Sequence, residues 1–138
     1  MKKNIITILF IMICIGAKAQ YSSKLIIEKL MQSDINSMGQ KISYPEVKDA
    51  KVTMMKITFP PGETTGWHKH NIPVFSYILK GTLTVQTEDN KITQFKENTS
   101  FAESHNIYHK GTNNEKTDLV VLAIYLGGDE KELSVKKE

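Results

Sequence analysis

All four histidines of this chain lie in one stretch, at His68, His70, His105 and His109. Neutral imidazole is the commonest metal ligand in proteins. Side chains two positions apart on a β-strand point to the same side, so His68 and His70 can converge on one ion while Lys69 faces away. The pair therefore predicts a metal site.

Short strands separated by turns are expected to position these histidines. The segment Val52 to Phe59 is rich in β-forming residues and stops at Pro60-Pro61-Gly62. Further strands are expected at residues 74–79, 82–87, 92–95, 100–102 and 119–126. A weaker apolar run predicts an edge strand near residues 24–34, with a helical turn as the alternative. This rhythm, with no convincing long helix, favours an all-β sandwich or barrel.

The beginning of the chain has the three parts of a secretory signal peptide. Lys2 and Lys3 precede an apolar run from Ile5 to Ala17, and Ala17-Lys18-Ala19 matches a cleavage site. The alternative is a membrane anchor, but the run is shorter than the roughly 20 residues that span a bilayer. Residues 1–19 are therefore expected to be removed between Ala19 and Gln20. The mature protein would be secreted or periplasmic, without a stable membrane anchor.

Removal of this segment changes the charge balance. The chain has 18 basic and 15 acidic residues, and residues 1–19 contain three lysines and no acid, so the mature chain is formally neutral. The sequence pI of about 8.9 then gives no support for a nucleic-acid partner. Cys14, the one cysteine, is removed as well. Residues 20–128 are expected to form one domain and residues 129–138, mostly charged, a solvated tail.

The histidine pair lies in a pattern that resembles the first motif of the cupin superfamily. That motif runs glycine, five residues, His-x-His, three or four residues, glutamate, six residues and glycine. Four residues stand at this spacing: Gly62, His68, His70 and Gly81. The glutamate is missing, because Val74, or Phe75 in the longer variant, takes its place.

A second stretch resembles the other cupin motif through its final histidine and asparagine, His109 and Asn113. Its two glycines and its proline are replaced here by Asn98, Asn106 and Ser104. Asparagine tolerates positive φ better than most residues, so these departures should affect the fold little. The resemblance runs from about Val52 to Gly127. It implies a cupin-type β-barrel, also called a double-stranded β-helix or jelly roll, like that of small single-domain cupins without an assigned substrate.

The resemblance also implies that His68, His70 and His109 bind one divalent transition metal. The alternative is a barrel in which these histidines only hydrogen-bond to each other. Three neutral ligands suit zinc, copper, iron or nickel, and manganese, which prefers more oxygen ligands, stays among the candidates. Open coordination positions would take water or substrate. Affinity is expected to suffer from the missing glutamate, so Val74→Glu should tighten binding if that side chain points inward.

Four further residues are candidates for roles around the metal. Glu103 can replace the missing carboxylate, as a partner of a ligand or as a general base, and a solvated strand end is its alternative. His105 is expected at the rim or behind the ligands. Tyr77 offers a hydroxyl, although tyrosine in such a barrel more often forms wall or core. Asn113 is expected close to the ligands.

Two classes of function stay open. The first is a metal-dependent enzyme that acts on a small exported or imported metabolite. The second is a ligand-binding or structural barrel without turnover and without metal. The partner is an unknown small molecule. The resemblance also implies a homodimer, for which the apolar run Leu25-Ile26-Ile27 is a candidate contact, because an uncovered apolar edge strand favours pairing.

Overall fold

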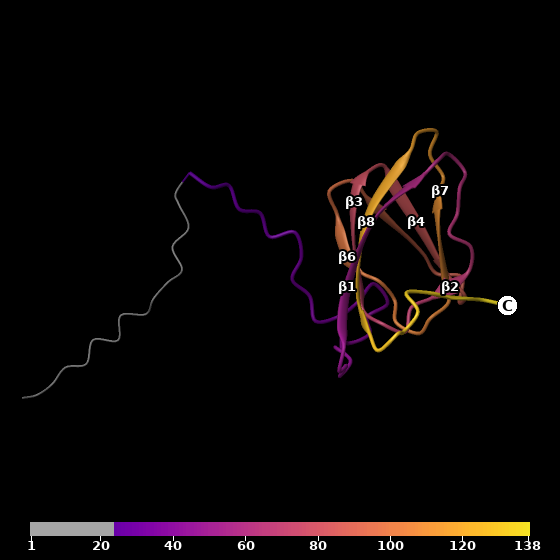
Figure 1. The fold of residues 1–138 in the computed structure, drawn as a ribbon. Coiled ribbons are helices and arrows are strands. Elements are labelled where there is room, and N and C mark those ends of the chain that lie inside the picture. The colour runs from indigo at the N-terminus through magenta and orange to yellow at the C-terminus, as the bar shows by residue number, and fades with distance from the viewer. Residues whose placement is uncertain (1–23) are drawn as a thin grey trace, which may run out of the picture.

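A computed structural model describes residues 24–138, which form two antiparallel β-sheets (Figure 1). The predicted signal peptide lies outside the described residues. Within residues 24–138 no helix is present, and so none is long and apolar enough to cross a membrane. The prediction of an all-β fold is confirmed.

Nine strands make up the two sheets within the described part of the chain. Their bounds are β1 Ala50–Phe59, β2 His68–Lys69, β3 Val74–Lys80, β4 Thr82–Thr87, β5 Ile92–Lys96, β6 Ser100–Ala102, β7 His109–Asn113, β8 Leu119–Gly128 and β9 Val135–Lys136. One sheet has the order β1-β8-β3-β6 and the other β5-β4-β7-β2-β9. Hydrogen bonds do not close them into one continuous barrel, so the arrangement is that of a jelly-roll sandwich. The strands β7 and β9 were not expected from the sequence.

The core lies between the sheets and follows the period-two pattern of the strands. On β8 the buried positions alternate with half-buried ones, and its buried side chains include Leu119, Val121, Ala123 and Tyr125. Leu119 and Val121 belong to one buried cluster, whose other members include Phe59, Ile78, Leu83 and Phe101. Ala123 and Tyr125 belong to a second cluster with Ile72 and Val74. The β8 strand therefore joins both halves of the core.

The predicted edge strand near residues 24–34 is wrong. This segment pairs with no strand and leads away from the sheets, and Ile26 is 92% exposed (Figure 1). Instead, a tight loop closed by the Ile35–Lys41 bridge covers the edge of the four-stranded sheet, where the Ser37 N–H donates to the Ala102 carbonyl. Because this loop covers the β6 edge, residues 24–34 do not pair there and lie outside both sheets. A homodimer stays a prediction.

The turns explain two departures from the cupin pattern. Asn98 and Asn106 have φ values of 63° and 56°, in the left-handed region where the family has glycine. Gly62 and Gly81 also have positive φ, at 81° and 82°. Since asparagine is among the few other residues that adopt this conformation readily, the turns keep their shape.

The charged segment 129–138 does more than extend into solvent. Most of its side chains are exposed as expected, but β9 pairs with β2, and the half-buried Leu133 packs against the second core cluster. The Lys137 N–H also donates to the Trp67 carbonyl. We refer to residues 129–137 as the C-terminal strap, which lies directly against the strand that carries His68.

Candidate metal centre

Three of the four histidines meet at the inner side of the five-stranded sheet. His68 lies on β2 opposite His109 at the start of β7, and His70 directly follows β2. The ring centroids are 4.5 Å apart for His68 and His109, 4.9 Å for His68 and His70, and 5.2 Å for His70 and His109. His70 and His109 are buried. The structure thus brings together the three predicted ligands.

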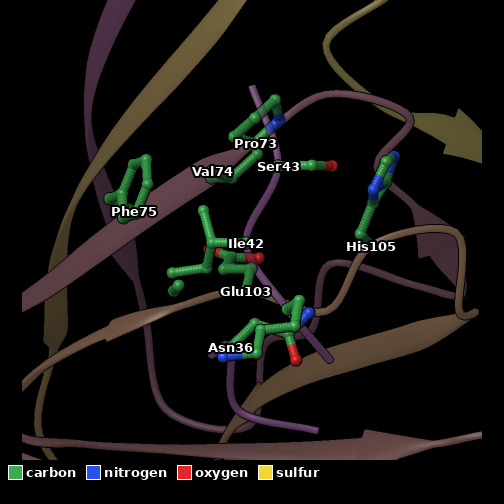
Figure 2. A pocket seen from close by; sticks show the side chains of 10 residues that line it. Asn36, Ile42, Ser43, Pro73, Val74, Phe75, Glu103 and His105 are labelled. Carbon is green, nitrogen blue, oxygen red and sulfur yellow. The ribbon is translucent and has the colours of Figure 1, made fainter. Parts of the chain in front are cut away.

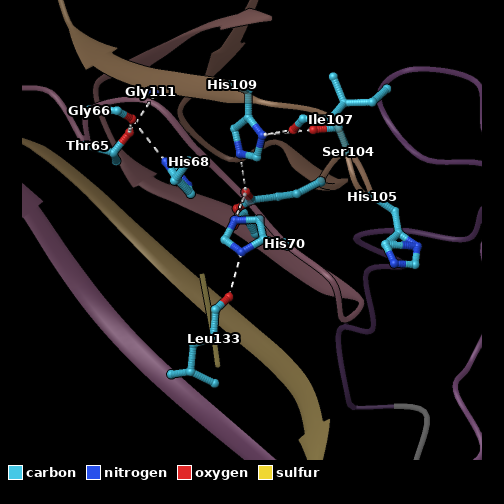
Figure 3. Close-up of polar contacts among 12 residues, drawn as sticks. Thr65, Gly66, His68, His70, Ser104, His105, Ile107, His109, Gly111 and Leu133 are labelled. Atoms are coloured by element: carbon cyan, nitrogen blue, oxygen red, sulfur yellow. Dashed lines mark hydrogen bonds and ion pairs between the residues drawn. The ribbon is translucent and has the colours of Figure 1, made fainter. Parts of the chain in front are cut away.

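Each of these rings is held by a backbone carbonyl at its Nδ1 atom (Figure 3). The distances are 3.0 Å from His68 Nδ1 to Gly66 O, 2.7 Å from His70 Nδ1 to Leu133 O, and 3.0 Å from His109 Nδ1 to Ile107 O. A carbonyl oxygen only accepts hydrogen bonds, so these contacts favour the tautomer with the proton at Nδ1; at His109 the Ser104 hydroxyl also lies 3.0 Å from Nδ1. In that tautomer the lone pair of a neutral ring is at Nε2, the nitrogen left for a metal.

Glu103 supplies the carboxylate that the first motif lacks. Its Oε2 atom lies 3.1 Å from His70 Nε2 and 3.4 Å from His109 Nε2, and Ser76 Oγ donates to its Oε1 at 2.5 Å. One ligand atom from each of the three histidines and from Glu103 lies within 4.8 Å of all the others. The Glu103 side chain is 16% exposed, so it is not a solvated strand end.

The position of Glu103 follows from strand pairing. Glu103 directly follows β6, and its N–H donates to the Val74 carbonyl on β3 at 2.9 Å. Val74, at the place of the missing motif glutamate, points inward and is 2% exposed. A carboxylate from the neighbouring strand therefore replaces the one that β3 does not provide.

One buried nitrogen atom of this cluster lacks a hydrogen-bond partner. His109 Nε2 is buried and has no hydrogen-bond partner among residues 24–138, because the nearby Glu103 oxygen at 3.4 Å is at ion-pair distance without hydrogen-bond alignment. A buried polar atom without a partner destabilises a protein. A metal ion bound to Nε2 would satisfy this atom, so the residues fit the group that the resemblance implies.

The charges of the site are strongly coupled. Burial alone would raise the pKa of Glu103, but His109, His70 and Ser76 outweigh it and hold this pKa well below its usual range. Burial likewise opposes protonation of His70, but Glu103 prevails and raises its pKa above 6.5. Burial lowers the pKa of His68. The site therefore favours an ionised Glu103 beside a readily protonated His70.

Tyr125 enters the site from β8 in the opposite sheet. Its ring lies edge-on to the His70 ring, with centroids 5.8 Å apart. Burial and the charge of Glu103 raise the pKa of Tyr125 to about 12. Its hydroxyl therefore keeps its proton at neutral pH and is a hydrogen-bond donor.

His105 and Tyr77 lie away from the cluster. His105 lies apart from the three clustered histidines (Figure 3), and its Nε2 is 3.3 Å from Asn106 Nδ2. It lines an outer hollow of about 280 Å³ together with Asn36 (Figure 2). Tyr77 points to the outside of the four-stranded sheet, where its hydroxyl donates to Asn98 Oδ1 at 3.1 Å. A role for His105 at the rim stays a prediction.

The Asn113 side chain forms hydrogen bonds to backbone carbonyl groups and none to the three histidines or Glu103. It is fully buried, and its Nδ2 atom donates to the Phe59 carbonyl at 2.9 Å and to the Thr117 carbonyl at 2.8 Å. The Gly62 N–H donates to the Asn113 carbonyl at 2.9 Å. Asn113 thus fixes the turn that leads from β1 towards His68.

The cupin domain family matches residues 55–125 of this chain, which is half of its length. The chain belongs to the cupin family. Among curated protein sequences, none is similar enough to this cupin to count as a relative.

Two solved structures with TM-scores of 0.50 or more show the same fold. A DMSP lyase from Ruegeria pomeroyi superposes with a TM-score of 0.53 at 16% identity over 62% of this chain and 43% of its own. A cupin-like protein from Thermotoga maritima gives 0.50 at 20% identity, over 54% and 56%. A cupin domain from Bordetella pertussis gives 0.48 at 26% identity, over 61% and 88%. This cupin spans less than half the length of the lyase.

Several groups in the site were not expected from the sequence, among them Ser76, Tyr125 and the Leu133 carbonyl, and Ser104 Oγ, which lies 3.0 Å from His109 Nδ1, is another. Ser76 and Tyr125 lie in strands whose sequences resemble ordinary core strands. Only their positions in the alternating pattern of β3 and β8 indicate that their side chains point inward. Leu133 lies in a charged segment that gave no sign of contact with the domain. No motif of this cupin marks them, because their roles depend on which strands become neighbours.

Proposed function

We propose that this cupin binds one divalent transition metal through His68, His70, Glu103 and His109, and that it holds a small molecule beside the metal. The observation that carries the proposal is that one ligand atom from each of these four residues lies within 4.8 Å of all the others, while the Nδ1 atom of each histidine contacts a backbone carbonyl. Three imidazoles with one carboxylate suit zinc, iron, nickel or copper, and the oxygen ligand keeps manganese among the candidates.

The residues of the site have separate tasks in this proposal. A bound metal would supply Lewis-acid chemistry or an oxygen site. Ser76 orients the carboxylate of Glu103 through Oε1, and the backbone carbonyls fix the orientation of the rings. An Oε2 atom that binds the metal has less capacity to accept a substrate proton, so the general-base role and the ligand role of Glu103 compete.

Metal analysis of purified variants tests this proposal. After metal addition, removal of the excess and elemental analysis, we expect close to one equivalent in the wild type and strong loss in His68→Ala and His109→Ala. His105→Ala is the matched control, since His105 lies outside the cluster, and it should keep the wild-type content. Less than about a tenth of an equivalent in the wild type, or full occupancy in the two ligand variants, would exclude the metal centre and favour the barrel without metal.

We also propose that the protein acts outside the cytoplasm. The support is the arrangement of residues 1–19, with Lys2 and Lys3, an apolar run and the Ala17-Lys18-Ala19 site. Mass spectrometry of the protein from its native compartment should find Gln20 as the first residue. Intact Met1 in that material would contradict export by this route.

A further inference from the structure

The hollow beside the histidines has walls that are largely hydrocarbon. It encloses about 420 Å³ that protein atoms do not fill, part of it open to solvent. Its walls come from both sheets and include Phe59, Leu83 and Val121. Of its volume, about 50 Å³ is open to the centres of water-sized molecules, and one water needs roughly 10–15 Å³ of such space, so the hollow has room for a few waters or one small ligand. The shape and lining fit a compact, mostly apolar ligand.

The charged groups of the hollow are few. Glu103 is the one carboxylate among its described lining residues, none of which is a lysine, and the chain contains no arginine. A divalent ion with one carboxylate and three neutral imidazoles leaves a single positive charge uncompensated. A ligand with one negative charge would neutralise it. A second anionic group would lie against the apolar walls without a partner, and burial of an unpaired charge is costly.

Tyr125 provides a polar group that the protein itself does not use. Its side chain lines the hollow, the residue is 8% exposed, and its ring contacts that of His70. Its hydroxyl makes no hydrogen bond to any residue from 24 to 138 and is not among the fully enclosed polar atoms, so it is free to donate to a molecule in the hollow. An oxygen atom of a ligand bound beside His70 would accept this hydrogen bond.

We infer that the hollow takes a compact monoanion with an apolar body. Its acid group would bind beside the metal and accept a hydrogen bond from the Tyr125 hydroxyl, and its body would pack against Phe59 and Val121. Dicarboxylates and zwitterions of the same size are disfavoured, because their second charge finds no partner on the walls. The inference rests on the proposed metal centre and adds the chemical class of its ligand.

A pair of ligands with the same shape tests the class. Succinate has the heavy-atom framework of 4-methylpentanoate, with a carboxylate in place of the isopropyl group. Titration calorimetry on metal-loaded protein near neutral pH should give an affinity for 4-methylpentanoate at least about tenfold higher than for succinate. Equal or tighter binding of succinate, or no binding of either acid to protein with its full metal content, would overturn the inference. A protein that takes up no metal would overturn the proposed function as well.

Two variants locate the contacts. Tyr125→Phe should weaken binding of 4-methylpentanoate about tenfold without loss of metal, since a hydrogen bond to a charged group is removed. Tyr77→Phe is the matched control, because that hydroxyl bonds to Asn98 outside the hollow, and it should bind like wild type. Val85→Lys places a cation at a half-buried wall position and should shift the preference towards succinate. Unchanged affinity in Tyr125→Phe would refute the hydrogen bond, and an unchanged ratio in folded Val85→Lys would refute the charge argument.

Discussion

The two sheets contribute to the site in different ways. The five-stranded sheet and the residue after β2 contribute the three histidines, whose convergence follows from local spacing and one pairing, His68 with His109. The four-stranded sheet contributes groups from three different strands or strand ends: Ser76, Glu103 and Tyr125. Strand parity thus predicts His68 and His70 and the family resemblance predicts His109, whereas groups from the facing sheet depend on the register of distant strands.

The largest expected effect comes from moving the carboxylate within the four-stranded sheet. Glu103→Val should lower metal affinity at least about 100-fold, because loss of a mere partner of a ligand already costs about 10- to 100-fold. Adding Val74→Glu to this variant should restore much of the affinity, since Val74 points inward beside Glu103. Competition with a chelator of known affinity measures both steps.

The sequence alone predicted that Val74→Glu would tighten metal binding. The position of Glu103 changes that prediction for the single variant. With Glu103 present, a second buried carboxylate would lie close to the first, and the two like charges would repel. Tighter binding is therefore expected only in the Glu103→Val background. A double variant that folds by circular dichroism yet binds no better than Glu103→Val would refute the equivalence of the two positions. Wild-type affinity in Glu103→Val would refute the carboxylate as a ligand.

A smaller effect concerns pH and separates the metal-free from the metal-loaded protein. The raised pKa of His70 contributes stability that is complete below pH 6.5 and is lost as pH rises through the folded value. The lowered pKa of Glu103 contributes stability that is complete above pH 4.5 and is lost as pH falls towards the folded value. The metal-free protein should therefore gain most from this pair between pH 4.5 and pH 6.5.

Metal binding should show the opposite trend, because a ligand histidine must be neutral. Since the pKa of His70 is raised, occupancy should begin to fall above pH 6.5 as the solution is acidified. Thermal unfolding across a pH series, with and without metal, measures both trends. The metal-free Glu103→Gln variant should lose the stability that the pair adds in the acidic range. A wild-type profile identical to that of Glu103→Gln would contradict the ion pair.

The smallest expected effect lies in a turn. Asn106→Ala should lower the free energy of unfolding by about 1 kcal/mol, because a residue with a Cβ is strained at positive φ. Asn106→Gly should be close to neutral, and both variants should keep their metal. Asn114→Ala, at an exposed position outside the left-handed region, is the control. Chemical denaturation measures the differences, and equal stability of the alanine and glycine variants would show that the turn carries no strain.

Much of the fold followed from the sequence because its strands alternate clearly and end at strong turn residues. The strands Thr82–Thr87 and Ser100–Ala102 have the predicted bounds. The apolar run at residues 24–34 forms no strand although its residues favour one, because a strand also needs a partner and the loop closed by the Ile35–Lys41 bridge already covers the β6 edge. The short strands β7 and β9 are polar or charged, and neighbours across the sheet stabilise them more than their own residues do.

The residues of the site likewise differ in how well the sequence predicted them. His68 and His70 follow from strand parity, and His109 from the resemblance. The sequence suggested Glu103 as a substitute carboxylate but gave no way to place it among the ligands, because its position depends on the pairing of β3 with β6. The contact from Leu133 to His70 depends on how the C-terminal strap packs against β2. No hydrophobic pattern in the sequence of the strap predicted that packing.

Because the C-terminal strap is made last, the candidate metal centre is completed late during synthesis and folding of the chain. The two neighbours of β2 are β7 and β9, both far along the sequence, so β2 cannot be paired on both sides until the strap has been made. During synthesis, all four proposed ligand residues emerge before the Leu133 carbonyl that orients His70. An early-bound ion would therefore meet a His70 ring still free to turn. Long-range contacts of this kind form slowly because a large loop must close first. The order of synthesis thus separates the moment when the ligands exist from the moment when their geometry is fixed.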